Sequence, residues 1–252
     1  MSFTILSEQN AKTIVNAIED ATGDVIKEDL SRSNLSYFNS TPQRVWDHIY
    51  TIVTRRIQRQ GFQVISTNSG PWRFPIIYDH TSGNIITIMR EKRFADLKKQ
   101  KGKRTKHHYV DILTAAFNKD LLAKQEQLSV LEKSRPELDE IKRRVDIMFH
   151  DFNGDTDLVR NHVLILFEAS DYTLFSARAI MVTPELETAV NAEDNLSELI
   201  EAKPSIIPDK VDNPDSAVNN PSLGLRLKAK AIERQQHYSR IHDESVRTEN
   251  DK

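Results

Sequence analysis

The sequence predicts an α+β fold in which a mixed or antiparallel sheet is flanked by helices. Apolar residues recur at helical spacing in several segments, and short runs of aromatic and β-branched residues occur in two separate groups. Turn residues divide each group into hairpin-like units. With 252 residues, of which 38% are hydrophobic, the chain can bury the core of one sizeable domain.

The first sixty residues or so read as helices. Ser7 is a good N-cap for a helix that stops near Gly23, and Asp24 to Leu30 can form a short second helix. Thr41-Pro42 opens a longer one, because proline is tolerated in the first turn, and Gly61 can cap its end. Its apolar positions recur at helical spacing: Val45, Trp46, Ile49, Ile52, Val53 and Ile57.

A strand and a β-hairpin are predicted next, from the runs 62–67, 72–78 and 85–89. Pro75 lies inside the second run, so that strand is expected to be an edge there or to carry a bulge. We expect the apolar residues of the hairpin to pack against helices 41–60 and 109–131. These residues are Trp72, Phe74, Ile77, Ile86 and Ile88.

The second half of the domain repeats the pattern of helices before strands. Tyr109 to Leu131 has a helical pattern, and a further helix begins after Pro136. The runs 163–167 and 172–182 predict a second hairpin, and Thr183-Pro184 is expected to start an acidic helix that ends near Ala202.

Three regions are predicted along the chain. Residues 1–202 form a single α+β domain, and 203–221 form a linker because four prolines stand among polar residues there. Residues 222–252 are expected to form a short basic helix that frays into a tail.

Charge is strongly segregated along the chain. Between residues 90 and 106 stand nine Lys and Arg residues and two acids, a local formal charge of +7, whereas the whole chain carries −2. Such a surface attracts polyanions, and Lys and Arg contacts to phosphates supply most non-specific nucleic-acid affinity. A solvated loop and a docking surface for an acidic protein are the alternatives that remain open.

We predict that residues 90–108, named the basic segment below, form a loop that contacts nucleic acid. The candidate contact residues are Arg90, Lys92, Arg93, Lys98, Lys99, Lys101, Lys103, Arg104, Lys106 and His107. His108 is expected to begin the helix that follows. Because neighbouring helical residues face different ways, the two histidines are not expected to form a metal or catalytic pair.

Several kinds of chemistry are not expected. Without cysteine the chain has no disulfide and no thiolate metal site, and its seven glycines build no phosphate-binding loop. Residues 151–157 resemble half of a calcium loop, but Thr156 and His162 stand where glycine and glutamate are needed. We therefore expect no metal and no cofactor, and a binding protein rather than an enzyme.

The N-terminus lacks the basic start and the long apolar run of a signal peptide. No window approaches the roughly 18 apolar residues of a membrane helix. We therefore expect a cytoplasmic protein that does not contact membranes.

The order of elements resembles the core of restriction-endonuclease-like nucleases, but their motif is missing. Those enzymes carry an acidic residue near the start of the second strand and a Glu-x-Lys on the third, which bind a metal. Here the second strand opens without a carboxylate, Glu91 and Lys92 are adjacent, and Asp79 lies at the far end of the hairpin. The resemblance implies at most a degenerate metal-dependent nuclease.

A second resemblance rests on Trp72-Arg73-Phe74, Ile76 to Asp79, Thr87 to Phe94 and His108-Tyr109. Over residues 40–180 the chain resembles an uncharacterised family of proteins from low-GC Gram-positive bacteria and their phages. The resemblance implies no activity and transfers no catalytic residue.

The function predicted from the sequence is a non-enzymatic binding protein whose basic segment contacts nucleic acid, in a phage or mobile-element context. A degenerate nuclease and a module that docks an acidic protein are the alternatives.

Overall fold

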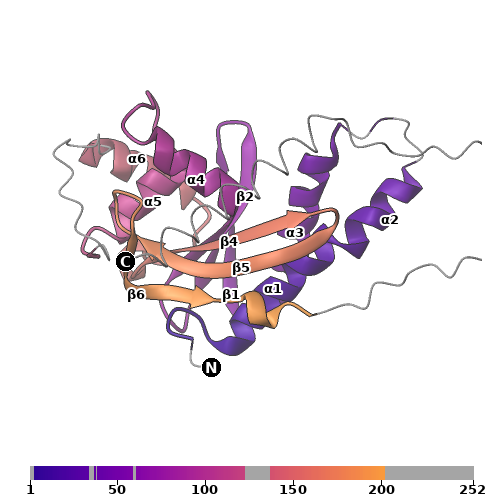
Figure 1. The fold of residues 1–252 in the computed structure, drawn as a ribbon. Coiled ribbons are helices and arrows are strands. Elements are labelled where there is room, and N and C mark those ends of the chain that lie inside the picture. Colours follow the sequence, from indigo (N-terminus) through magenta and orange to yellow (C-terminus); the bar gives the residue numbers. More distant parts are fainter. Residues whose placement is uncertain (1–2, 34–36, 38, 59–60, 123–136, 202–252) are drawn as a thin grey trace, which may run out of the picture. The chain divides into compact units, whose positions relative to one another are not determined.

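A six-stranded sheet with its strands in sequential order lies at the centre of the fold (Figure 1). Its first half is an antiparallel meander of β1 (Phe62–Ser69), β2 (Trp72–Asp79) and β3 (Ile85–Arg90). Its second half is another, of β4 (His162–Ser170), β5 (Thr173–Val182) and β6 (Thr188–Asn195). β3 and β4 are parallel, so the sheet is mixed and the predicted α+β class is confirmed.

The helices cover the two faces of this sheet. Along β4, Val163, Ile165 and Phe167 belong to one hydrophobic cluster, and Leu164 and Leu166 belong to the other. The first cluster includes residues of α1 (Glu8–Thr22), α2 (Asp24–Arg32) and α3 (Thr41–Ile57). The second includes residues of α4 (Glu91–Gln100), α5 (Tyr109–Phe117) and α6 (Leu138–Met148). Strand alternation therefore gives each layer of helices its own core.

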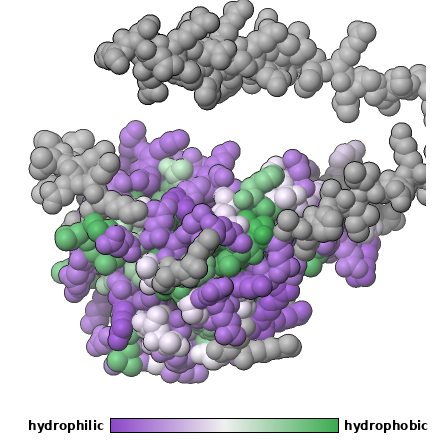
Figure 2. Space-filling model, turned by 60° about the horizontal axis from the view of Figure 1, so that its bottom comes forward, coloured by the Kyte–Doolittle hydropathy of each residue, from purple (hydrophilic) through white to green (hydrophobic). Residues whose placement is uncertain are grey.

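The computed structural model describes residues 3–33, 37, 39–58, 61–122 and 137–201, all within one unit, Met1–Lys203. The predicted linker 203–221 and helix 222–252 lie outside the described residues. Two 3-10 turns, Thr156–Leu158 and Ser197–Leu199, complete the regular structure of this part. Hydrophilic residues cover most of the face seen in Figure 2, and hydrophobic ones form smaller separate patches. Among the described residues, no helix combines the length and apolar character needed to cross a membrane.

The predicted acidic helix after Thr183 is wrong, because residues 188–195 form the edge strand β6. Inward-facing Ala189, Ala192 and Asp194 are buried. The Asp194 carboxylate accepts hydrogen bonds from the backbone N–H groups of Thr4 at 2.9 Å and Ile5 at 2.8 Å. This contact with the other end of the domain outweighs the local helical preference of an acidic segment.

The basic segment is only partly a loop, because α4 occupies its first half. Phe94 and Leu97 are three residues apart on this helix and are both buried against the sheet. Glu91 lies in the first turn, and Lys98 and Lys99 lie in the last, where each charge suits the helix dipole. Two large apolar residues in ten are a weak periodic signal, so this helix could not be predicted from the sequence.

Helix α5 ends at Phe117, so the helix predicted over residues 109–131 is shorter than expected. Residues 123–131 of that prediction lie outside the described residues. Asn118 follows it and is fully buried. Its amide donates to the carbonyls of His162 at 2.9 Å and Val182 at 2.8 Å, and its Oδ1 accepts from the His162 N–H at 2.7 Å. Asn118 thus ties the end of α5 to β4 and β5.

The hairpin packs as predicted except at Trp72. Ile77, Ile86 and Ile88 lie in the cluster with α3, and Phe74 stacks on Tyr109 of α5 with ring centroids 4.3 Å apart. Trp72, by contrast, is 37% exposed, so the prediction that it belongs to the core is wrong. It lies at the first position of β2, where its ring still meets Trp46 of α3 edge-on, with centroids 6.2 Å apart.

Pro75 lies on an unpaired side of β2, as the sequence predicted. β1 pairs along the whole of β2, but β3 pairs with it only through Ile77 and Tyr78. The first residues of β2 therefore form an edge toward β3, where proline is tolerated.

We predict that Trp72→Ala leaves the fold stable while Phe74→Ala does not. The exposed Trp72 side chain should cost ~1–2 kcal/mol of unfolding free energy, whereas the buried, stacked Phe74 should cost ~3–5 kcal/mol through its cavity. Urea titration of both variants measures the difference. An equal loss of unfolding free energy in the two variants would show that Trp72 contributes to the core as Phe74 does.

We also predict that the unfolding free energy decreases at acidic pH because His162 is buried in its neutral form. Burial lowers the pKa of His162 from 6.5 to about 3 in the folded chain. The contribution of the neutral His162 ring to the unfolding free energy is therefore constant above about pH 6.5 and is lost as the pH falls toward 3. The reason is that His162 is protonated at a higher pH in the unfolded chain than in the folded chain. The unfolding free energy of wild type relative to His162→Gln should drop by up to ~1.4 kcal/mol per pH unit in that window.

The measurement is a series of urea titrations between pH 7 and pH 4. His150→Gln serves as the control, because the His150 side chain is exposed. A wild-type advantage over His162→Gln that stays constant across this range would contradict the prediction.

Candidate functional site

Two adjoining cavities open where β2 begins and β3 ends. Since β2 and β3 pair only through Ile77 and Tyr78 on β2, the remaining residues of the two strands diverge. Trp72 of β2 and Met89 and Arg90 of β3 line a cavity of about 480 Å³ in this gap. We name it the aromatic pocket, after its four rings from β2, α3 and α5. They are Trp46, Tyr50, Trp72 and Tyr109.

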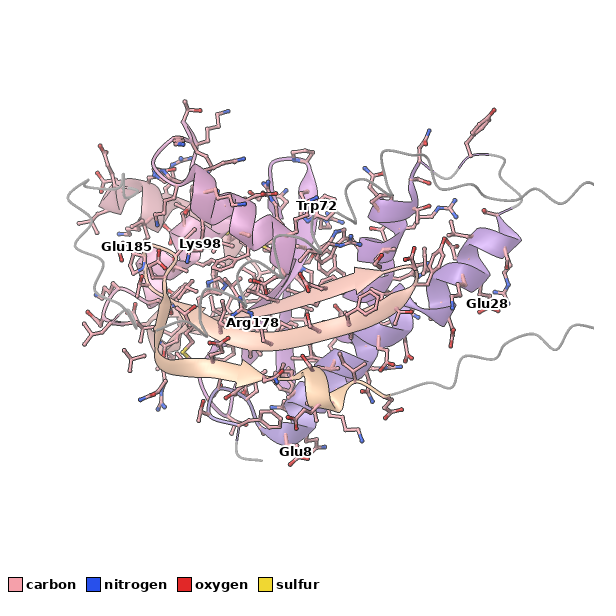
Figure 3. All side chains as sticks on the ribbon, in the orientation of Figure 1. Glu8, Glu28, Trp72, Lys98, Arg178 and Glu185 are labelled. Atoms are coloured by element: carbon pink, nitrogen blue, oxygen red, sulfur yellow. The ribbon has the colours of Figure 1, made fainter. Side chains whose placement is uncertain are left out.

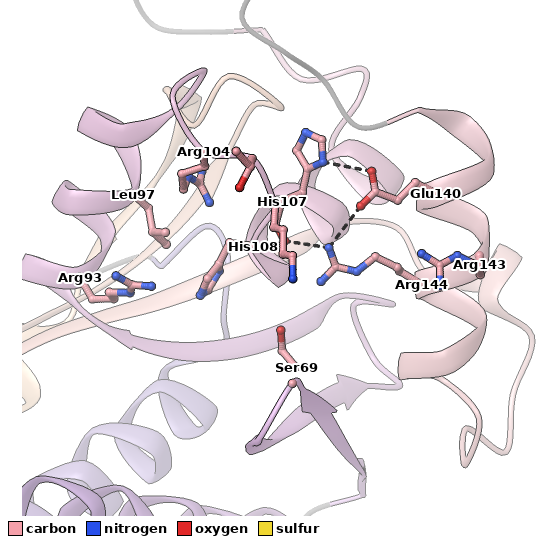
Figure 4. A pocket seen from close by; sticks show the side chains of 12 residues that line it. Ser69, Arg93, Leu97, Arg104, His107, His108, Glu140, Arg143 and Arg144 are labelled. Atoms are coloured by element: carbon pink, nitrogen blue, oxygen red, sulfur yellow. Dashed lines mark hydrogen bonds and ion pairs between the residues drawn. The ribbon is translucent and has the colours of Figure 1, made fainter.

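The second cavity, of about 660 Å³, is the basic cleft (Figure 4). Five cations line it: Arg93, Arg104, Lys106, Arg143 and Arg144. Arg93 and Arg104 lie on one side, Arg143 and Arg144 of α6 on the other, and Ser69 faces them from the β1–β2 hairpin (Figure 4). Both cavities share Ser69, Arg93 and His108, so they form one continuous surface.

The β1–β2 hairpin places Ser69 and Trp72 beside each other at this surface. Ser69 is paired with Trp72, so only Gly70 and Pro71 form the turn. Gly70 has φ 63°, which a residue with a side chain rarely adopts, and glycine at the first central position is typical of a tight hairpin turn. The Gly-Pro pair thus fixes where Trp72 begins the strand.

His108 caps α5 and faces both cavities. Its Nδ1 accepts a hydrogen bond from the Val110 N–H at 3.3 Å, so the proton of the neutral ring is on Nε2. Burial, together with the charges of Arg93, Arg104 and Arg144, lowers the pKa of His108 to about 4. At neutral pH the ring is therefore an uncharged donor between cations.

A hydrogen-bonded bracket holds α6 against the start of α5. The Glu140 carboxylate lies 3.0 Å from His107 Nδ1 and 3.5 Å from Arg144 Nη1. Arg144 also donates to the His107 carbonyl at 2.8 Å. Of the described residues that line the basic cleft, Glu140 is the one carboxylate, and it is already paired. The cleft therefore keeps a positive charge.

The candidate contact residues of the basic segment divide into three groups. The first group lines the cavities. The basic cleft is lined by Arg93, Arg104, Lys106 and His107. The aromatic pocket is lined by Arg90 and also by Arg93. Lys92, Lys99 and Lys103 are exposed and line neither cavity.

The third group serves the fold. The Lys101 side chain is 4% exposed, donates to the Pro184 carbonyl and lies 3.9 Å from Asp111. Lys98 of α4, labelled in Figure 3, contacts Glu187 of the β5–β6 connection at 2.7 Å. Arg104 lies 2.8 Å from Asp111 as well as lining the cleft, so it has both roles.

Sequence reasoning missed the contribution of α6 and of the rings. Arg143 and Arg144 lie in a Lys-Arg-Arg triplet on a helix that opens with acids, a signal that could have been noticed. Trp46 and Tyr50 are four residues apart, on one face of α3, with ring centroids 5.2 Å apart. That spacing is equally typical of core residues, and it carries no indication of a pocket.

The carboxylates weighed for a nuclease do not meet. Asp79 lies beside the start of β3 and accepts from the Thr81 N–H at 2.9 Å and the Ser82 hydroxyl at 2.8 Å. Glu91 follows the other end of β3 and accepts two hydrogen bonds from Arg178, at 2.6 and 3.0 Å. In the part of the chain that the structure describes, no three His, Asp or Glu residues could hold a metal ion together.

Comparison with curated proteins and with solved structures found no significant match. A family profile described as "Family of unknown function (DUF5986)" matches residues 4–244. The match spans the whole described domain and extends well into the C-terminal segment. It confirms the expectation from the sequence that the chain belongs to an uncharacterised family. Because the profile covers nearly the entire chain, the protein belongs to this family of unknown function, DUF5986.

Proposed function

We propose that the protein binds nucleic acid and that the basic cleft contacts the phosphate backbone. One observation carries the proposal: cations from the basic segment and from α6 converge on a single cavity. Lys and Arg contacts to phosphates are the main source of affinity in such complexes.

The cations that line the cleft are only partly used by the fold. Arg93, Lys106 and Arg143 make no ion pair with any described residue, whereas Arg104 and Arg144 are anchored by acids. Cations gathered around one cavity repel each other, so an anion that enters it is favoured. Arg93 and Arg143 present guanidinium groups, which suit bidentate phosphate contacts.

The neighbouring rings favour nucleic acid over an acidic protein. Carboxylates need cations but gain little from a cavity lined by four aromatic side chains. A nucleic-acid strand uses both, because its phosphates need the cations and its bases can stack on the rings. The resemblance noted in the sequence adds a phage or mobile-element context to the proposal.

We predict that the cleft, rather than the basic segment as a whole, determines affinity. The triple variant Arg93→Gln, Lys106→Gln, Arg143→Gln should bind a mixed-sequence duplex and single strand more weakly. Its plot of log affinity against log salt should be shallower by up to ~2–3, because each phosphate that the variant no longer neutralises reduces the slope by about 0.7–0.9. Fluorescence anisotropy at several salt concentrations provides the measurement.

The matched control removes three charges from outside the cleft: Lys92→Gln, Lys99→Gln, Lys103→Gln. It should lose less affinity and change the slope less. An equal loss in the control would assign binding to the exposed part of the basic segment. Strand cleavage in magnesium would favour the nuclease alternative, and absence of binding to DNA and RNA at low salt would favour an acidic protein partner.

A further inference from the structure

The aromatic pocket contains both tryptophans of the chain. The Trp46 ring lies 5.2 Å from Tyr50 and 6.2 Å from Trp72, at 90° to the latter. Trp46 also contacts Phe167 of the core, with centroids 5.6 Å apart. One end of this ring cluster is thus held by the core, and the other end, Trp72, is exposed.

Trp72 is held in place although it is exposed. Burial raises the pKa of the Tyr50 hydroxyl to about 12, and a hydrogen bond with Trp72 acts in the opposite direction. The indole is therefore positioned by its strand and by its edge-on contact with Trp46 (Figure 3 marks its position at the start of β2). A large ring fixed at a cavity wall costs little further entropy when a flat ligand stacks on it.

Polar groups stand at the same pocket. Arg90 lies over the Phe167 ring at 5.9 Å, and its Nε has no hydrogen-bond partner among the described residues. Arg93 and the Nε2–H of His108 lie where the pocket joins the basic cleft. These groups are all donors at neutral pH, so the site suits a flat ring that carries acceptor atoms and is joined to a phosphate.

We propose that the aromatic pocket holds one unpaired nucleobase of a strand whose phosphates lie in the basic cleft. This inference rests on the proposed function and adds its substrate class, single-stranded or locally unpaired nucleic acid. Bases in a duplex are stacked on each other and cannot enter such a pocket, whereas unpaired bases stack readily on aromatic side chains. A cavity of about 480 Å³ is within the range that holds small flat ligands.

Other occupants use fewer of these features. A metal ion would need acidic ligands, and none lines this pocket among the described residues. An aliphatic side chain of a protein partner would fill the apolar walls but leave Arg90, Arg93 and His108 without acceptors. A free nucleotide has the same chemistry as a base on a strand, so the experiment must separate the two.

The test compares a short single strand with a strand of the same length in which abasic units replace the nucleotides. Both carry the same phosphates, but only the first has bases. Wild type should prefer the strand with bases, and Trp72→Ala should weaken binding to that strand by roughly 5- to 100-fold while leaving the abasic strand and a duplex unchanged. Trp72→Phe, which keeps a ring, should restore most of the affinity.

Intrinsic tryptophan fluorescence gives a second readout. Since both tryptophans line the pocket, quenching by the strand but not by its abasic counterpart supports the inference. Equally weakened binding of both strands in Trp72→Ala, or no preference for bases in wild type, overturns it while leaving the cleft proposal intact. A nucleoside monophosphate that binds as tightly as the strand also overturns it, in favour of a free nucleotide. Failure to bind any of the three polymers would instead remove the proposed function itself.

Discussion

The parallel pairing of β3 with β4 is the constraint from which the rest of the structure follows. Antiparallel neighbours can be joined by a tight turn, but parallel ones require a long connection across one face of the sheet. Here that connection contains α4, α5 and α6. The basic segment therefore lies in a crossover rather than in a surface loop, and its first residues are held directly beside the end of β3. Arg90 and Arg93 therefore line the cavity that opens between β2 and β3.

Within this crossover, one buried carboxylate organises the approach to the cleft. Asp111 of α5 accepts from the His108 N–H at 2.7 Å and from Arg104 at 3.0 Å, and it lies 3.9 Å from Lys101. A buried charge is tolerated only when it is paired and hydrogen-bonded, so these partners are not free to leave it. Asp111 thereby fixes the loop that carries Lys106 and the orientation of His108.

What could be read from the sequence was the local part of the fold. α1, α3 and the two hairpins follow from spacing and turn residues that act over a few positions. β6 could not be read in this way, because the partner of Asp194 is the backbone near Thr4, at the other end of the domain. α4 was not predicted, because its buried face consists of Phe94 and Leu97 alone.

The candidate site was predictable to a similar degree. Counting charges located Arg93 and Lys106, but it could not show that the Lys101 side chain is buried beside Asp111. Arg143 is fifty residues from Arg93 in the sequence, and only the crossover brings the two to one cavity. From the sequence, Trp72 was predicted to lie in the core because tryptophan side chains are usually buried. The Trp72 side chain is exposed because β2 and β3 stop pairing before this end of β2.

The hydrogen bonds from Thr4 and Ile5 to Asp194 also determine when this domain can fold during synthesis. α1 contributes Ile14 and Ile18 to a cluster that also needs Ala177 and Leu196, near the end of the domain. At typical translation speeds the ribosome needs roughly 10–40 s to add the residues between the two ends. During that interval α1 can pack against α3 and the first strands, but the residues of β5 that complete its cluster are missing. The packing of α1 against β5, and the hydrogen bonds of the N-terminal backbone to β6, can therefore form only after those last strands have been made.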